Sequence, residues 1–160
     1  MLPTTMEKMV IYLRPATMED ADTLYAWRND LETCANSRHT SPVPRRRHDL
    51  WMEINVKYGY PTRVVLIAET GDNIPVGVVD FASADPKTES FEVNVTVAPR
   101  LRGHGYGSAA LALACKRMKD KALKAEIRTE NRASRRIFRK CGFLLMSEAD
   151  GFAQFRKEKE

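Results

Sequence analysis

The clearest pattern along the chain is an alternation of apolar and polar side chains in residues 90–97. Phenylalanine or valine occupies each odd position from 91 to 97, while Glu92, Asn94 and Thr96 lie between them. Successive side chains of a β-strand point to opposite faces, so this stretch predicts a strand with one buried face. Apolar runs bounded by turn residues predict further strands, in residues 10–16, 63–69, 74–83 and 121–129 and in a final hairpin over 143–157.

A helical spacing follows the glycines at positions 103, 105 and 107. Leu111, Ala114, Cys115 and Met118 recur at i, i+3, i+4 and i+7, which places them on one face of an α-helix. The glycines therefore lie where this helix begins.

Two helices are predicted between the first and second strands. Thr17 and Asp20 resemble a capping box that begins a helix extending through Asp30. A second helix is expected between Pro44 and Gly59. The apolar face of the first helix would comprise Leu24, Trp27 and Leu31.

A last helix is predicted in residues 131–141, just before Gly142, a residue type that favours helix C-termini. The predicted order is β-α-α-β-β-β-α-β-α-β-β, which indicates an α/β fold with a mixed central sheet and flanking helices. No repeat, low-complexity tract or linker divides the 160 residues. We therefore expect a single domain over residues 1–160.

The composition bears on the cellular setting. Cys34, Cys115 and Cys141 are odd in number and lack the paired spacing of a zinc site, which argues against a disulfide framework or a bound metal. No run of about 18 apolar residues suggests a membrane span. The first fifteen residues lack the pattern of a cleaved signal peptide. We expect a cytoplasmic protein with no membrane partner.

The charge leaves two classes of partner to consider. The net charge of +5 is compatible with an anionic small-molecule ligand. The arginines at 45–47 and a pI near 9.2 raise the alternative of a nucleic-acid-binding protein. No zinc finger, helix-turn-helix or RNA-recognition sequence accompanies them, so we expect no nucleic-acid partner.

The glycine segment indicates an anion site. A helix N-terminus offers unpaired N–H groups and the positive end of the helix dipole, and glycine allows a phosphate to approach that backbone closely. The dinucleotide fingerprint is one alternative, because Gly105, Gly107 and Ala110 fit its spacing and Glu130 lies further on. Residues 99–102 separate the strand from the glycines, and too few strands follow for that fold. The Gly-Lys-Ser/Thr ending of a Walker A loop is absent.

Two motifs carry a resemblance to a known family. The segment from Arg102 to Gly107 resembles motif A of the GCN5-related N-acetyltransferases, Q/R-x-x-G-x-G/A. Downstream, Asn131, Ser134, Phe138 and the Gly-Phe pair at 142–143 resemble the second signature of that family. The resemblance implies the same order of elements, acetyl-CoA as co-substrate, no metal, and direct transfer of acetyl to a primary amine.

The resemblance also implies which residues bind acetyl-CoA. Backbone groups of the strand before the loop would pair with the pantetheine arm, the glycine loop would surround the pyrophosphate, and the second motif would border the arm and the thioester. The implied cofactor-binding residues are Val95, Val97, Arg102, Gly103, His104, Gly105, Tyr106, Gly107, Ser108, Asn131, Arg135 and Phe138.

The catalytic groups are predicted less directly. Phe138 occupies the position where many family members have a tyrosine that protonates the departing thiolate, so the proton donor is left open. Glu92 is the candidate general base, because it lies on the polar face of the strand that leads to the loop. A solvated carboxylate without a catalytic role would show the same alternation.

The acceptor is a small-molecule amine in this interpretation. Residues of the first two helices resemble the branch that acetylates nucleotide-linked amino sugars, with Trp27, Arg28, Asn29, His48 and Trp51 as implied acceptor-binding residues. The two tryptophans also lie at helical spacings that are typical of buried core residues, so a structural role is the alternative. An acetyltransferase of protein N-terminal amines and a non-catalytic CoA-binding module are the alternatives, and a homodimer is left open.

Overall fold

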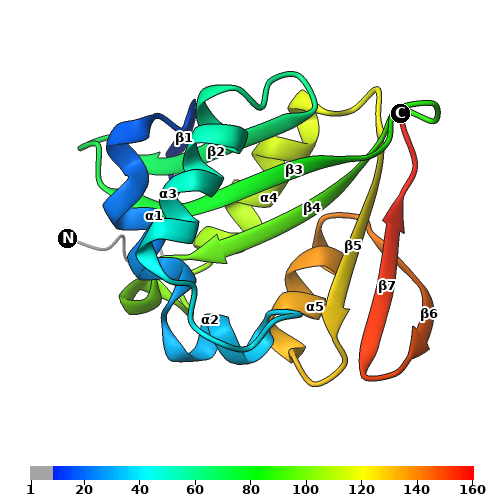
Figure 1. The fold of residues 1–160 in the computed structure, drawn as a ribbon. Coiled ribbons are helices and arrows are strands. Elements are labelled where there is room, and N and C mark those ends of the chain that lie inside the picture. The colour runs from blue at the N-terminus through cyan, green and yellow to red at the C-terminus, as the bar shows by residue number, and fades with distance from the viewer. Residues whose placement is uncertain (1–8) are drawn as a thin grey trace.

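A computed structural model describes residues 9–160, whose centre is a seven-stranded sheet with the order β1-β2-β3-β4-β5-β7-β6 (Figure 1). Neighbouring strands are antiparallel, except that β4 and β5 run parallel. This confirms the predicted mixed sheet. The expectation that no signal precedes the domain rests partly on residues 1–8, which lie outside the described residues. The strands are β1 (Ile11–Pro15), β2 (Arg63–Thr70), β3 (Pro75–Asp85), β4 (Ser90–Val97), β5 (Ala122–Arg128), β6 (Leu144–Ala149) and β7 (Phe152–Lys157).

Helices cover both faces of this sheet. The helices are α1 (Ala21–Arg28), α2 (Leu31–Asn36), α3 (Arg45–Met52), α4 (Tyr106–Arg117) and α5 (Arg132–Lys140). On one face α1 and α3 bury Trp27 and Met52 against Ile67 of β2. On the other face α4 and α5 bury Leu111 and Phe138 in a larger core. Figure 1 shows α1 and α3 on the near side of the strands and α4 behind them. Within residues 9–160, no helix is both long and apolar enough to cross a membrane.

The first predicted helix is divided in the structure. Thr17 and Asp20 form the capping box, and it opens a short 3-10 turn before α1. The helix ends at Arg28, and the carboxylate of Asp30 then caps α2 by accepting the N–H of Thr33 at 3.3 Å. This change of axis turns Leu31 away from the core, where it is 87% exposed. The prediction that Leu31 continues the apolar face is therefore wrong.

The parallel pair β4–β5 creates the opening that matters for function. The two strands are in register only from Ser90 opposite Ala122 to Glu92 opposite Lys124. Beyond that point they separate, although β4 continues to Val97. The connection between them is α4, because parallel neighbours need a crossover that passes over a face of the sheet. The N-terminus of α4 consequently lies near the separated ends of the strands.

Candidate active site

The N-terminus of α4 has the features of an anion site. Its N-cap residue is Gly105, whose φ of +86° is left-handed, and Gly103 has a φ of +80°. Glycine adopts this conformation without the steric cost that a Cβ imposes. No side chain caps this twelve-residue helix among the described residues. The first N–H groups of α4 are therefore left to a ligand, and the helix dipole favours a negative one.

Gly107 allows α4 to begin close to its neighbours. A Cβ at this position would lie 2.8 Å from Cδ1 of Ile137 and 3.1 Å from Cγ2 of Val97. The helix start is thus pressed against both β4 and α5, which form the remaining sides of the site. A larger residue would push the helix away from them.

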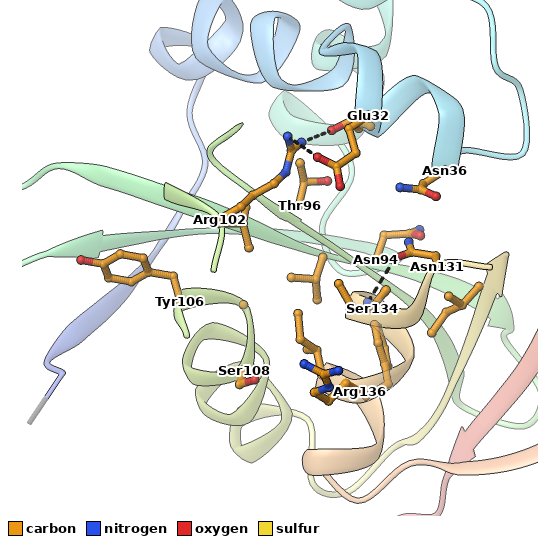
Figure 2. Close-up of a pocket in the computed structure, with 18 of the residues that line it drawn as sticks. Glu32, Asn36, Asn94, Thr96, Arg102, Tyr106, Ser108, Asn131, Ser134 and Arg136 are labelled. Atoms are coloured by element: carbon orange, nitrogen blue, oxygen red, sulfur yellow. Dashed lines mark hydrogen bonds and ion pairs between the residues drawn. The ribbon is translucent and has the colours of Figure 1, made fainter. Parts of the chain in front are cut away.

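A cavity of about 470 Å³ extends from this helix start into the gap between β4 and β5. Its walls are the glycine loop and α4, residues 93–97 of β4, the start of α5, and Glu126 and Ile127 of β5. Residues of α2 and Ser37 border the same cavity. Figure 2 shows Asn94 and Thr96 on β4 between Arg102 on one side and Asn131 and Ser134 on the other. The cavity joins the anion site to the opposite face of the sheet.

The structure brings together the residues predicted to bind the cofactor, with two exceptions. All of them except His104 and Arg135 line the cavity. His104 is exposed on the loop. The guanidinium of Arg135 donates to the carbonyl oxygen of Thr129 at 2.8 Å and pairs with Glu148 at 2.6 Å, so it faces away. The next residue, Arg136, is exposed and lines the cavity instead.

Two residues of the second motif have structural tasks as well. The side-chain oxygen of Asn131 accepts the N–H of Ser134 at 3.2 Å and so caps α5 (Figure 2). Phe138 is buried and packs edge-on against Phe143, with ring centroids 4.9 Å apart. Both still border the cavity, which places an amide and an aromatic ring along its length.

Arg102 ties the glycine loop to α2. Its guanidinium pairs with Asp30 at 2.7 Å and with Glu32 at 2.9 Å, and donates to the hydroxyl of Thr33 at 3.0 Å. The hydrogen bond from Arg102 lowers the pKa of Asp30. The side chain is thus committed to α2 (Figure 2), and the loop presents its backbone to a ligand.

Comparison with known proteins shows the family of the chain. The family model described as an acetyltransferase (GNAT) domain matches residues 11–144. The chain belongs to the GNAT acetyltransferase family. It is accordingly an acetyl-CoA-dependent N-acetyltransferase. No curated protein sequence matches the chain.

Several solved structures share the GNAT fold. A domain from Methanocaldococcus jannaschii is 21% identical, with a TM-score of 0.78 over 94% of this chain and 99% of that one. A ribosomal alpha-N-protein acetyltransferase in complex with coenzyme A is 14% identical, with a TM-score of 0.80 over 95% and 96%. Spermidine N-acetyltransferase from Vibrio cholerae, in complex with CoA and spermine, is 14% identical, with a TM-score of 0.76 over 91% and 92%.

The predicted base of this GNAT domain lies outside the cavity. Glu92 is exposed on the face opposite α4, at the last paired position before β4 and β5 separate. Glu126 of β5 lines the cavity instead. One of its carboxylate oxygens accepts a hydrogen bond from Gln154 at 2.9 Å, and the other pairs with Arg38. The signal in the sequence that could have found Glu126 is the alternation of β5, which buries Leu123 and the other odd positions and leaves the even positions partly or fully accessible.

Two of the predicted acceptor residues lie in the core. Trp27 is 8% exposed and His48 is 5% exposed. Nε2 of His48 contacts the carbonyl oxygen of Ala21 at 2.9 Å, and its ring stacks between Tyr25 and Trp51. Burial lowers the pKa of His48. The prediction that these two side chains bind the acceptor is corrected, because packing between α1 and α3 occupies them.

The remaining predicted acceptor residues also make contacts within the fold. The amide of Asn29 binds both backbone groups of Val43, donating at 2.9 Å and accepting at 2.7 Å. Arg28 donates to the carbonyl oxygen of His39 at 3.2 Å. Trp51 lies under the guanidinium of Arg63 at 5.3 Å. None of them lines the cavity, so these side chains shape α1, α3 and the connection between them.

Proposed function

We propose that this GNAT domain transfers acetyl from acetyl-CoA to a primary amine that enters the cavity from the side of α2 and β5. The observation that carries the proposal is the cavity itself, which runs from the uncapped N-terminus of α4 through the gap in the sheet to the carboxylate of Glu126. One end suits a pyrophosphate and the other suits a cationic amine. The amine and the cofactor therefore approach from opposite sides of the sheet.

In the proposed complex the pyrophosphate binds the N–H groups that begin α4. The pantetheine arm follows the edge of β4 at Val95 and Val97, where β3 pairs on one side and the side toward β5 is open, and Asn131 faces the arm from α5. The thioester then lies near Phe138. An extended arm that pairs with an open strand edge uses backbone hydrogen bonds that would otherwise be left to water.

The chemistry needs a neutral amine at the thioester. We propose that Glu126 takes one proton from the bound ammonium, after which the nitrogen attacks the carbonyl carbon. The nitrogen loses its second proton to water as the amide forms. The C–S bond breaks, and its electron pair leaves with sulfur. Phe138 has no proton to give, so water protonates the thiolate, whose parent thiol has a pKa of about 8.5.

The raised pKa values of two cysteine thiols support direct transfer without an acetylated enzyme. Burial raises the pKa of Cys115 to about 12 and also raises the pKa of Cys141. A thiol at neutral pH is a poor nucleophile in this state. The acetyl group therefore passes from sulfur to the amine within a ternary complex.

The nucleotide-linked amino sugar stays a prediction for the acceptor. The arginines predicted to meet its diphosphate are Arg38 and residues 45–47, which are all exposed. The test is acetyl-CoA consumption with nucleotide-linked and free amino sugars, peptides with free N-termini, amino acids and polyamines. Turnover with at least one amine supports the proposed function. Tight acetyl-CoA binding without turnover on any of them would indicate a non-catalytic CoA-binding module.

A further inference from the structure

The ion pair between Arg38 and Glu126 lies where the acceptor amine must arrive. We propose that this pair opens to receive a zwitterion, so that the acceptor carries an anionic group beside its amine, as an α-amino acid does. Glu126 binds the ammonium and Arg38 binds the carboxylate. The inference rests on the proposed function, because it names the class of amine that the same cavity accepts.

The two partners of this ion pair differ in how firmly they are held. The side chain of Glu126 is 20% exposed and is fixed by the hydrogen bond from Gln154. The side chain of Arg38 is 60% exposed and comes from the connection that follows α2. Arg38 can therefore turn away while Glu126 stays in place. An ammonium that replaces Arg38 finds a carboxylate already oriented.

The surroundings keep Arg38 near the cavity after it leaves Glu126. Its guanidinium lies 5.0 Å from the ring centroid of Phe152 on β7, and that of Arg128 lies 4.9 Å from the same centroid. Arg128 is held by the carbonyl oxygen of Ser37, to which it donates at 2.8 Å and 3.0 Å. The region beyond Glu126 is therefore cationic, which favours an anionic group on the acceptor.

The charged side chains on and beside the cavity wall disfavour polyamines and amines that carry no anionic group. Glu32 and Glu126 are the carboxylates that line it, and each is already paired with an arginine. A polyamine would bring a second ammonium toward Arg38 and Arg128. An amine without an anionic group would displace Arg38 and leave its guanidinium without a partner. In a zwitterion the ammonium becomes the new partner of Glu126 and the carboxylate becomes the new partner of Arg38. Neither side chain is then left without an ion pair.

The test compares α-amino acids with their own amides, which keep the amine and the side chain but lack the carboxylate, and with spermidine. We expect kcat/KM to be about 10-fold or more higher for the acid than for its amide, because a charge-assisted hydrogen bond distinguishes them. Arg38→Gln should remove this preference by raising the KM of the acid about 10-fold or more, with the KM of acetyl-CoA unchanged. Arg38→Lys should keep part of the preference for the acid, since lysine has the same charge but lacks the two parallel N–H donors of the guanidinium.

Arg156→Gln on β7 is the matched control, because it removes another partly exposed arginine outside the cavity and should preserve the preference. The proposal of a zwitterionic acceptor would be overturned if amides or spermidine were turned over as well as the acid or better. It would also be overturned if Arg38→Gln changed the KM of acid and amide alike. The proposed function would stand in both cases. Thermal unfolding of each variant shows that it is folded. Absence of turnover with every amine would overturn the proposed function itself, and the zwitterion with it.

Discussion

Replacing Gly105 by glutamate tests where the cofactor binds. A Cβ at this position has room, since its nearest neighbour is Cε of Met9 at 3.6 Å. The added carboxylate would project at the start of α4, where the pyrophosphate is proposed to lie. Two costs follow from this substitution, and they can be measured separately: backbone strain, which affects folding, and repulsion, which affects only binding.

The strain is set by the left-handed φ of +86° at Gly105. A residue with a Cβ costs about 1–2 kcal/mol in this conformation. For a chain of this size that corresponds to a fall in Tm of roughly 2–8 °C. Gly151 is a matched control, because its φ is +82° and no atom lies within 4 Å of its added Cβ. Gly151→Glu should therefore show a similar fall in Tm.

The repulsion is specific to Gly105→Glu. Two unit charges of like sign at 4 Å repel by about 4 kcal/mol at an effective dielectric constant of 20. The affinity for acetyl-CoA should consequently fall on the order of 1,000-fold in this variant. Gly151→Glu, in the β6–β7 turn, should bind acetyl-CoA like the unmodified protein. Titration calorimetry gives the affinities, and thermal unfolding gives the stabilities. Equal acetyl-CoA affinity in the two folded variants would refute the placement of the pyrophosphate.

Three further predictions concern catalysis, packing and pH. Glu126→Gln should lower kcat/KM by about 100-fold or more at neutral pH, with Glu92→Gln much less affected; the reverse result in a steady-state assay would assign the base to Glu92. Trp27→Ala should destabilise the fold by about 3–5 kcal/mol in denaturant titration, because the ring is buried. An unchanged stability together with a raised acceptor KM would instead show that Trp27 binds the acceptor. The lowered pKa of Asp30 stabilises the fold above the carboxyl's unfolded pKa, and this contribution is lost as the pH falls through the folded pKa. Arg102→Gln should therefore lower stability at pH 7 more than at pH 2, and a pH-independent difference in unfolding free energy would contradict the ion pair.

The helix start that is proposed to bind the cofactor could be predicted from the sequence because it is built from neighbouring residues. A helix N-terminus with its free N–H groups is made by one short stretch, from Gly103 to Ser108. The alternation of residues 90–97 similarly gives the strand beside it. Such features depend on local backbone geometry, and the periodicities of helix and strand show it directly in the residue order.

The residue order alone does not show which side chains of α5 face the cavity. Arg135 and Arg136 are adjacent, yet one pairs with Glu148 and the other lines the cavity. Neighbouring helical residues point about 100° apart, so an error of one position changes which side chain meets the ligand. The sequence predicted that Arg135 faces the cofactor, and the packing of α5 places Arg136 at the cavity instead.

The acceptor side depends on tertiary structure for a further reason. Arg38 and Glu126 are 88 residues apart, and Gln154 lies another 28 residues beyond Glu126. Glu126 and Gln154 meet because they lie opposite each other in the antiparallel pair β5–β7, and the connection that follows α2 brings Arg38 to the same carboxylate. Neither the strand pairing nor the path of that connection leaves a periodic pattern in the chain. The sequence by itself therefore determined the fold and the glycine loop at the start of α4, and only the tertiary structure decided which carboxylate lines the cavity and which arginine pairs with it.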